Sequence, residues 1–336
     1  VIMQILISAG SISSLLQGLM VPLCTYIILA VSLNLVVGIL GELSLGHAGF
    51  MCVGAFTSAF FSKCTRDVIA SDGLRFFLAL LIGIVTAAIF GMLIGIPVLR
   101  LKGDYLAIVT LAFGEIIKNM VNVLYIGKDS KGFHVTTKDV MALNMDADGT
   151  VILNGPQGIT GTPKNSTFVI GFILILLTLF IVQNLINSRD GRAIMAIRDN
   201  RIAAESIGIN ITKYKLMAFT ISAAMAGAAG VLYAHNISTL TANTNNFGYN
   251  MSITILVFVV LGGIGNIRGS IIAAVILTLL PELLRGMKDY RMLIYAIVLI
   301  VMMLFNWSPK AIEWREKLND WRKKHFSFGK KAKEVE

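Results

Sequence analysis

The sequence predicts an all-α integral membrane protein, a polytopic helical bundle of about 8–10 transmembrane segments. Of its 336 residues, 56% are hydrophobic and only 14% are charged, whereas a soluble domain carries about 25% charged residues. The stretch Phe168–Val182 has Leu, Ile, Val or Phe at thirteen of its fifteen positions. At roughly −0.3 to −0.6 kcal/mol each, these side chains favour insertion into a bilayer by about 4 to 8 kcal/mol. Because no face of such a helix is polar, we expect it to span a membrane.

The same criterion, about 20 apolar residues per span, predicts about ten segments with an error of about two. Three of them, Leu43–Phe61, Tyr105–Tyr125 and Met251–Ile264, are short or interrupted by Gly, and half-membrane helices are the alternative there. The first segment lacks a basic flank and a clear cleavage pattern, so we expect a retained transmembrane helix there rather than a cleaved signal peptide. The ten segments are Ile2–Leu19, Val21–Leu40, Leu43–Phe61, Phe76–Leu99, Tyr105–Tyr125, Thr167–Ile186, Tyr214–Ala234, Met251–Ile264, Ser270–Leu284 and Met292–Phe305.

The distribution of Lys and Arg predicts the orientation. Ser188–Lys215 carries six basic residues, whereas the longer loop 126–166 carries four Lys and no Arg. Basic loops stay in the cytoplasm, so the first loop is expected inside and the second outside. An even number of spans then places both termini in the cytoplasm. We expect a transmembrane domain over residues 1–306 and a basic cytoplasmic tail over 307–336.

Loop 126–166 is rich in Gly, Asn, Asp and Thr, and we expect no regular secondary structure there. A docking platform and a simple connector both remain open for it.

The net charge of +10 does not call for a nucleic-acid partner, because the excess falls largely in short loops and in the tail. Cys24, Cys52 and Cys64 show no C-x-x-C spacing and are expected to act as small apolar side chains. A membrane-embedded enzyme needs a convergent set of acid, base or nucleophile, and only Glu42 and His47 come near one. We therefore expect no catalytic residue, no cofactor and no metal site.

One polar stretch interrupts an apolar run. GELSLGHAGF, Gly41–Phe50, lies inside Val21–Phe61, where Glu42 is the one charged residue. Ionisable groups near membrane depth usually face a cavity or a partner. For His47, a place in a cavity wall and a structural hydrogen bond are both open.

Small residues recur at four-residue spacing in two places. Ser44, Ala48 and Cys52 are expected on one face of the helix that follows Gly41, and Ala223–Gly227 and Ala226–Gly230 repeat the spacing. Such residues let helix backbones approach closely in lipid. The Gly-rich stretches at 41–54 and 262–269 are also candidate counterparts in two halves, as in transporters with interrupted helices.

Two further charged groups fall within or beside a span. Glu115 and Lys118 are one helical turn apart, which predicts an ion pair facing the protein interior, with substrate contact as the alternative. Asp104 lies at the cytoplasmic boundary, next to basic residues that are expected to snorkel.

A short cytoplasmic helix is expected at Asp199–Ile207, because good helix formers precede Gly208 as a stop. The adjacent Ala203 and Ala204 suit close docking into the groove of a partner. Since the surrounding loop is net positive, contact with lipid is the alternative.

A family resemblance rests on four stretches. AAESIG, from Ala203, resembles the EAA loop of ABC-transporter permeases. GELSLGHAGF is similar to the G-Q-L-S-L-G-H-A-x-F pattern of LivM-type branched-chain amino acid permeases, with Glu42 where Gln is more usual. KGDYLAIVTLAFGEI and VLGGIGNIRGSIIAAVILTLLPELLR, from Lys102 and Val260, also resemble that family. The four stretches occur in order and cover most of Leu33–Arg285.

The resemblance implies an ABC importer permease in the bacterial inner membrane. Its implied partners are a second homologous permease, two cytoplasmic ATPases and an extracytoplasmic binding protein. It implies ATPase coupling within residues 188–213, through Arg198, Asp199, Ala203, Ala204, Glu205 and Gly208. It also implies a signature or translocation role for Glu42, Ser44, Gly46, His47, Asp104, Tyr105, Glu115, Gly262 and Gly263.

The chain itself has no G-x-x-x-x-G-K-[ST] motif, because GKD at Gly127 lacks the upstream Gly and the Ser or Thr. ATP hydrolysis is therefore expected from partner chains, and the chain is expected to be a transport subunit rather than an enzyme. The resemblance predicts import of Leu, Ile and Val, driven by movement of the Asp199–Gly208 element. A urea or short-amide permease is the alternative within the class. An ion-coupled secondary transporter with a proton relay of Glu42, His47, Glu115 and Lys118 is the alternative outside it.

Overall fold

The computed structural model describes residues 14–66, 68–101, 103–146, 149–284 and 290–307. Two compact units can be distinguished, residues 1–278 and 279–336, and each is treated by itself. The second unit contains α13 (Arg291–Trp307). The expected tail beyond Trp307, and most of the expected first span, lie outside the described residues.

Among the described residues, six helical segments are long and apolar enough to cross a membrane. They are α2 (Ser14–Asn34) with η1 (Leu35–Leu40), α4 (Asp72–Val98), α5 (Asp104–Val123), α6 (Phe168–Asn187), α9 (Ile211–Ala234), and α10 (Thr244–Phe247) with α11 (Tyr249–Gly262). Three other expected segments correspond to α3 (His47–Cys64), α12 (Ile267–Leu283) and α13. The expected all-α polytopic class is confirmed. The expected boundary between Leu19 and Val21 is wrong, because α2 runs through it with Pro22 inside the helix.

Helix α9 forms the centre of the first unit and contacts α2, α3, α4 and α6. Its packing depends on small residues. A Cβ atom added to Gly227 would lie 2.4 Å from the Cβ of Ala87 on α4. One added to Gly54 on α3 would lie 2.4 Å from the carbonyl oxygen of Gly227. Three helices thus meet at backbone distance, as the small-residue spacing predicts.

A small antiparallel sheet lies at one end of this unit. Strands β1 (Tyr125–Asp129), β2 (Gly132–Thr136) and β3 (Thr150–Asn154) pair in the order β2-β1-β3. The expectation of an unstructured external loop is therefore wrong. Its turn residues connect short strands. In addition, β4 (Ile159–Thr160) pairs with β5 (Thr239–Leu240), which follows α9 in the chain.

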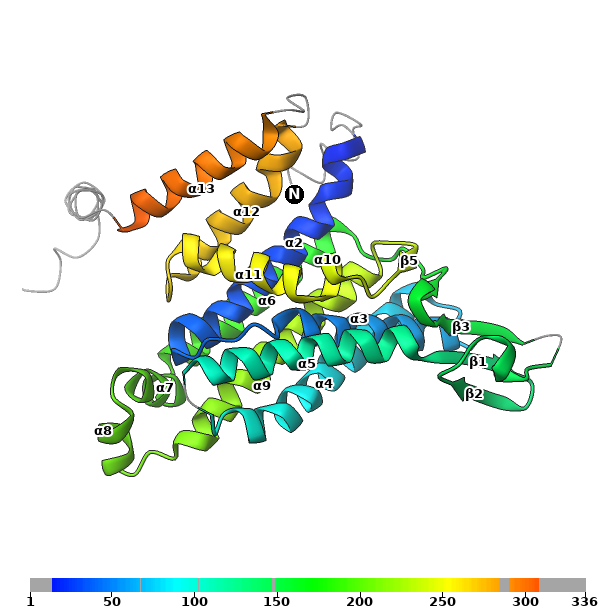
Figure 1. Ribbon diagram of the computed structural model, residues 1–336, viewed down its shortest axis with the longest axis horizontal. Coiled ribbons are helices and arrows are strands. Elements are labelled where there is room, and N and C mark those ends of the chain that lie inside the picture. Colours follow the sequence, from blue (N-terminus) through cyan, green and yellow to red (C-terminus); the bar gives the residue numbers. More distant parts are fainter. Residues whose placement is uncertain (1–13, 67, 102, 147–148, 285–289, 308–336) are drawn as a thin grey trace, which may run out of the picture. The chain divides into compact units, whose positions relative to one another are not determined.

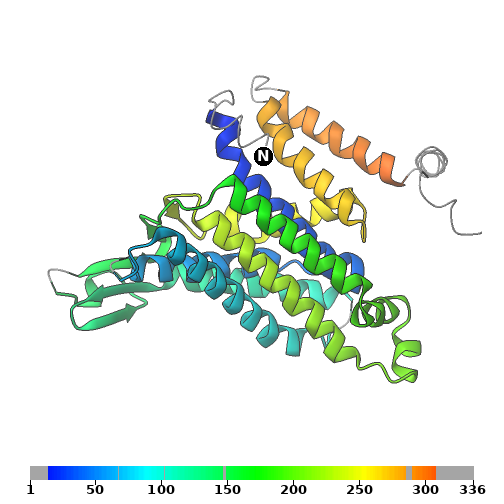
Figure 2. The ribbon, with the colours of Figure 1, turned by 180° about the vertical axis from the view of Figure 1, so that it is seen from behind.

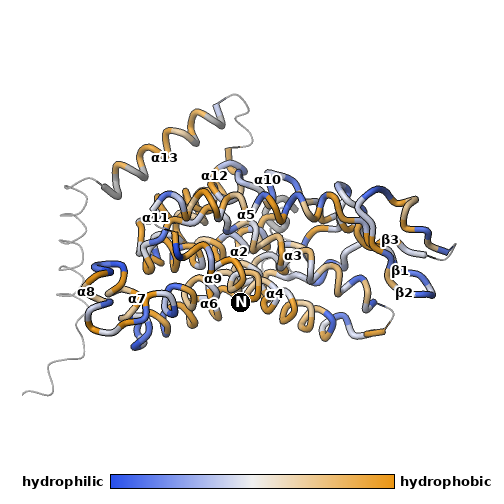
Figure 3. The backbone as a smooth tube through the Cα atoms, turned by 60° about the horizontal axis from the view of Figure 1, so that its bottom comes forward, coloured by the Kyte–Doolittle hydropathy of each residue, from blue (hydrophilic) through white to orange (hydrophobic). Residues whose placement is uncertain are grey.

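Helices α7 (Arg189–Asp199) and α8 (Arg201–Ser206) lie at the opposite end of the first unit from the sheet (Figure 1). Seen from behind, α6 and α9 run side by side toward them (Figure 2). The helices between the two ends are mostly hydrophobic, whereas α7, α8 and the sheet carry most of the hydrophilic residues (Figure 3). This distribution suits a protein that crosses a membrane and extends into water at both ends.

Candidate functional site

The segment Gly41–Gly46 is an irregular connection inside the helix bundle. Helix α2 continues into the π-helical turn η1, which ends at Gly41 in the left-handed conformation (φ 79°). Helix α3 begins only at His47, so the expected helix start at Leu43 is wrong. Ser44 therefore does not share a helical face with Ala48 and Cys52.

Two hydroxyl groups from distant helices satisfy the backbone of this connection. The N–H of Leu45 donates to Oγ1 of Thr110 on α5 at 3.0 Å. The N–H of Ala48 donates to Oγ of Ser252 on α11 at 3.2 Å. Irregular backbone at membrane depth is tolerated only where protein or water satisfies its polar groups, and here protein does so. Close packing also explains Gly46, because a Cβ atom there would lie 2.1 Å from the carbonyl oxygen of Thr110.

Two polar side chains are buried here, Ser44 within the connection and His47 directly after it. The Ser44 side chain has no hydrogen-bond partner within the described residues. His47 has one, since its Nε2 lies 2.6 Å from Oγ of Ser32 on α2. The carbonyl oxygen of Ser32 in turn accepts a hydrogen bond of 2.6 Å from Ser222 on α9. His47 thus belongs to a hydrogen-bonded junction of three helices.

Glu42 forms an ion pair with Lys215, in the second turn of α9. The Lys215 side chain is 6% exposed and that of Glu42 is 15% exposed. A charge so buried is stable only when it is paired. The carboxylate of Glu42 therefore balances the charge of Lys215, which the neutral side chain of Gln would not do.

Arg198, at the end of α7, joins the α7–α8 loop to η1. Its Nη1 donates to the carbonyl oxygen of Gly38 at 3.0 Å, while its Nε and Nη2 both contact Oδ1 of Asp199 at 3.0 Å. Its side chain also covers Gly41, where an added Cβ atom would lie 2.6 Å from Cγ of Arg198. A movement of α7 would therefore act directly on the backbone of η1.

The turn between α11 and α12 contacts the end of α2, directly before η1. Asn34, the last residue of α2, accepts from the N–H of Gly265 at 2.9 Å and donates to Oγ of Ser270 at 2.8 Å. Gly263 and Gly265 have positive φ (93° and 82°), which favours Gly at both positions. A Cβ atom on Gly262 would lie 2.4 Å from the backbone of Ser270. The Gly-rich stretch 262–269 therefore packs against the end of α2 at Asn34 and against Gly38 of η1.

The loop between α6 and α9 contains two helices, α7 and α8, rather than one. Asp199 ends α7, and Asn200 caps α8 by accepting from the N–H of Ala203 at 3.0 Å. The short helix expected at Asp199–Ile207 is present as α8, but this cap starts it at Arg201, and α7 before it was not expected. The expected stop is present, since Gly208 has φ 86°.

One face of α8 is anchored and the other is free. Ala204 is buried against Ile197 and Ile211. Ile202 and Ile207 are 81% and 75% exposed. Ala203, Glu205 and Gly208 are also exposed. Large apolar side chains this exposed on a hydrophilic loop are typical of an interaction surface.

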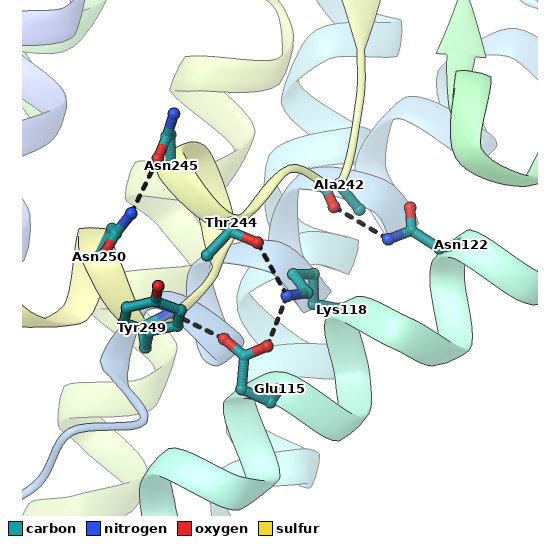
Figure 4. A network of polar contacts seen from close by, with 8 residues as sticks. All are labelled: Glu115, Lys118, Asn122, Ala242, Thr244, Asn245, Tyr249 and Asn250. Atoms are coloured by element: carbon teal, nitrogen blue, oxygen red, sulfur yellow. Dashed lines mark hydrogen bonds and ion pairs between the residues drawn. The ribbon is translucent and has the colours of Figure 1, made fainter.

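The remaining predicted residues lie on α5. Glu115 and Lys118 form the expected ion pair, with Nζ to Oε2 at 2.5 Å (Figure 4). Lys118 also donates to Oγ1 of Thr244 at 3.1 Å, and Glu115 accepts from the N–H of Tyr249 at 2.8 Å. Glu115 thereby caps the start of α11. Asp104 and Tyr105 are exposed at the first turn of α5, and within the described chain no hydrogen bond or ion pair joins them to these groups.

The sequence analysis missed the partners that complete these contacts: Asn34, Thr110, Lys215, Ser222 and Ser252. Asn34 is a polar residue inside an apolar run, and that signal was present in the sequence. The others are ordinary hydroxyls or a Lys near a helix start, and only the three-dimensional packing gives them a role.

The chain matches the family model described as "Branched-chain amino acid transport system / permease component" over residues 15–305. The chain belongs to this family. The permease is 35% identical to the high-affinity branched-chain amino acid transport system permease protein LivM of Salmonella typhimurium, over 85% of this chain and 67% of the relative. It is 34% identical to LivM of Escherichia coli K12 over the same shares.

The permease is also 25% identical to LivH of Escherichia coli K12, over 75% of this chain and 79% of LivH. No solved structure matches it. Its family membership and its apolar helices make it a multi-pass membrane protein and a transport component.

Proposed function

We propose that this chain is the permease subunit of an ATP-driven importer for leucine, isoleucine and valine. The observation that carries the proposal is the family match over almost the whole helical bundle, together with two LivM relatives of similar identity. The similarity to both LivM and LivH supports pairing with a second, homologous permease.

We place the end with α7 and α8 in the cytoplasm of the cell and the sheet outside. The loop that holds α7 and α8 has the excess of Arg and Lys, which supports this orientation. The transmembrane domain then covers residues 1–306, with an extracytoplasmic binding protein at the sheet. Deleting Asp139–Thr150 should lower the ATP turnover that the binding protein stimulates, and unchanged stimulation would contradict this contact.

Two cytoplasmic ATPases would supply the energy through α8. Its exposed Ile202 and Ile207 would dock into them, and Arg198 would pass the movement to η1 through its bond to Gly38. The geometry supports this route because the contacts are continuous from α7 to η1 and then to the α11–α12 turn. Movement of such packed elements between two arrangements is how access to a site is switched.

The ion-coupled alternative is less well supported. A proton relay needs a connected series of titratable groups. Here Glu42 is paired with Lys215 and Glu115 with Lys118, and no hydrogen bond or ion pair between the described residues connects the two pairs. A urea or short-amide substrate is the alternative within this class of transporter, but the LivM relatives support branched-chain amino acids.

The test is an Ile202→Asp variant, with Met141→Asp in the external loop as the matched control. An apolar hot spot contributes about 2 kcal/mol or more to an interface, so Ile202→Asp should purify as a folded permease without its ATPases. Met141→Asp, also on an exposed side chain, should retain them. Co-purification of the ATPases with Ile202→Asp at normal stoichiometry would refute the coupling role. Ala204 is less suitable for this test because it is buried in the loop.

A further inference from the structure

One surface of the first unit is polar at membrane depth. Asn245, Asn250 and Thr254 are exposed on α10 and α11. Asn250 lies twelve residues before Gly262, the end of α11, which is about 18 Å along the helix at about 1.5 Å per residue. This is more than half of a hydrocarbon core about 30 Å thick.

The Glu115–Lys118 pair lies beside Thr244 and Tyr249, where α10 and α11 meet α5 (Figure 4). Glu115 is eleven residues from the start of α5, or about 16 Å along it. Its side chain is 24% exposed, whereas that of Lys118 is 9% exposed. Ionisable groups at this depth face the protein interior or a water-filled path rather than lipid.

Two other helices show what a lipid-facing surface of this protein looks like. On α4, the exposed large side chains from Leu74 to Ile96 are all apolar. On α6, those from Val169 to Ile181 are apolar as well. The polar side chains of α10, α11 and α5 therefore distinguish one face of the bundle from the faces that suit lipid.

We infer that this face lines the aqueous route of the substrate and binds its zwitterionic backbone. The inference rests on the proposed function, because a free amino acid carries one ammonium and one carboxylate group. Lys118 would pair with the substrate carboxylate and Glu115 with its ammonium group, in exchange for their pairing with each other. The amides of Asn245 and Asn250, which hydrogen-bond to each other at 2.9 Å, are additional polar groups on the route.

The break between α10 and α11 contributes to this site. Glu115 accepts from the N–H of Tyr249 at the start of α11, so the carboxylate of Glu115 already occupies a place that suits an anion. When Glu115 turns to a substrate ammonium group, the substrate carboxylate could take over this N–H. Interrupted helices near the bilayer midplane offer the same type of group in other transporters.

The experiment measures how fast a charged, membrane-impermeant methanethiosulfonate reagent modifies single cysteines. It uses the assembled transporter in proteoliposomes, with Cys24, Cys52 and Cys64 replaced by Ala. The test positions are Asn250→Cys and Thr254→Cys, and the matched controls are Val85→Cys on α4 and Leu177→Cys on α6. A thiol reacts as the thiolate, which forms in water and not in lipid, so the test positions should react at least about tenfold faster than the controls. L-leucine should slow their reaction.

Each result decides one part of the proposal. Reaction at the test positions as slow as at the controls would overturn the aqueous face. Fast reaction without protection, in a transporter that takes up leucine, would overturn substrate binding at this face. Fast reaction without protection, in an assembled transporter that takes up urea and not leucine, would instead overturn the proposed substrate class and leave the aqueous face standing.

Discussion

At the scale of single residues, the pair of Glu42 and Lys215 explains an unusual charge in the apolar part of the chain. Neither side chain is more than 15% exposed, so each charge depends on the other. Removing one partner of a buried pair costs about 3–5 kcal/mol, whereas replacing both with residues of similar size is often neutral. We therefore expect Lys215→Met and Glu42→Gln to destabilise the permease singly and to compensate each other when combined.

The measurement is a double-mutant cycle on thermal stability in detergent, which isolates the energy of the pair. Glu205→Gln, on the exposed surface of α8, is a suitable control for loss of one charge. Additive losses in the double variant would show that the two side chains do not act as a pair.

Arg198 leads to a different prediction, because its proposed role is to transmit movement. Its hydrogen bond to the carbonyl oxygen of Gly38 is charge-assisted, and such bonds contribute about 1.5–3 kcal/mol. Arg198→Met should retain ATPase binding, because the exposed face of α8 is unchanged, but should lower transport by about 10-fold or more. Arg192→Met, on the same helix, serves as the control, because Nη1 of Arg192 donates to the carbonyl oxygen of Asn187 at the end of α6 rather than to η1. Loss of ATPase binding by Arg198→Met would instead assign Arg198 to the docking surface.

At the scale of elements, the β1–β2 turn is organised by one carboxylate. Burial raises the pKa of Asp129, but hydrogen bonds from the N–H groups of Lys131, Asp146 and Gly132 and from His134 outweigh burial and lower it. A lowered pKa in the folded sheet means that Asp129 stabilises the sheet above its unfolded pKa of about 3.9 and loses this effect as pH falls through the folded value.

Hydrogen exchange of residues 125–154 checks this expectation. The protection of these amides, which is their exchange rate relative to an unfolded chain at the same pH, should be unaffected by Asp129 titration between about pH 5 and 8 and should fall below about pH 4. Asp129→Asn should lower this protection between about pH 5 and 8, and the difference from the wild type should shrink as Asp129 becomes protonated. Asp139→Asn, on an exposed turn of the same loop, should have a smaller effect. Equal exchange in the wild type and in Asp129→Asn at pH 7 would contradict the role of the carboxylate.

The elements also show how far the sequence alone reaches. The expected span Thr167–Ile186 agrees closely with α6, because a continuous apolar run and the capping Thr167 are local features. The late start of α3 at His47 was not predictable, since the hydroxyls that satisfy the preceding backbone come from Thr110 and Ser252. The break at Asn200 lies between these cases, because an Asn cap is a local feature but was not recognised as one.

The candidate site likewise combines contacts between residues close in sequence with contacts between residues far apart in sequence. The Glu115–Lys118 pair follows from helical spacing and could be predicted from the chain alone. The partner of Glu42 could not, because Lys215 is far away in sequence and only the packing of α9 brings it near. Likewise, no sequence pattern links Arg198 to Gly38.

At the scale of the whole molecule, the remaining question is the direction in which the bundle crosses the membrane. The sheet and the α7–α8 pair lie at opposite ends of the first unit, so one labelled site at each end determines the orientation (Figure 1). The α7–α8 loop carries six basic residues against four Lys in the loop that contains the sheet, and the basic end should stay inside.

In a variant free of the three native cysteines, Asp139→Cys should react with an impermeant maleimide on intact cells. Ser206→Cys should react only after the membrane is opened, because α8 would lie on the cytoplasmic side. Both side chains are exposed, so access to the reagent and not burial decides the result. The reverse pattern would place α8 outside the cell, where no ATP-hydrolysing partner could reach it, and the proposed coupling would then be wrong.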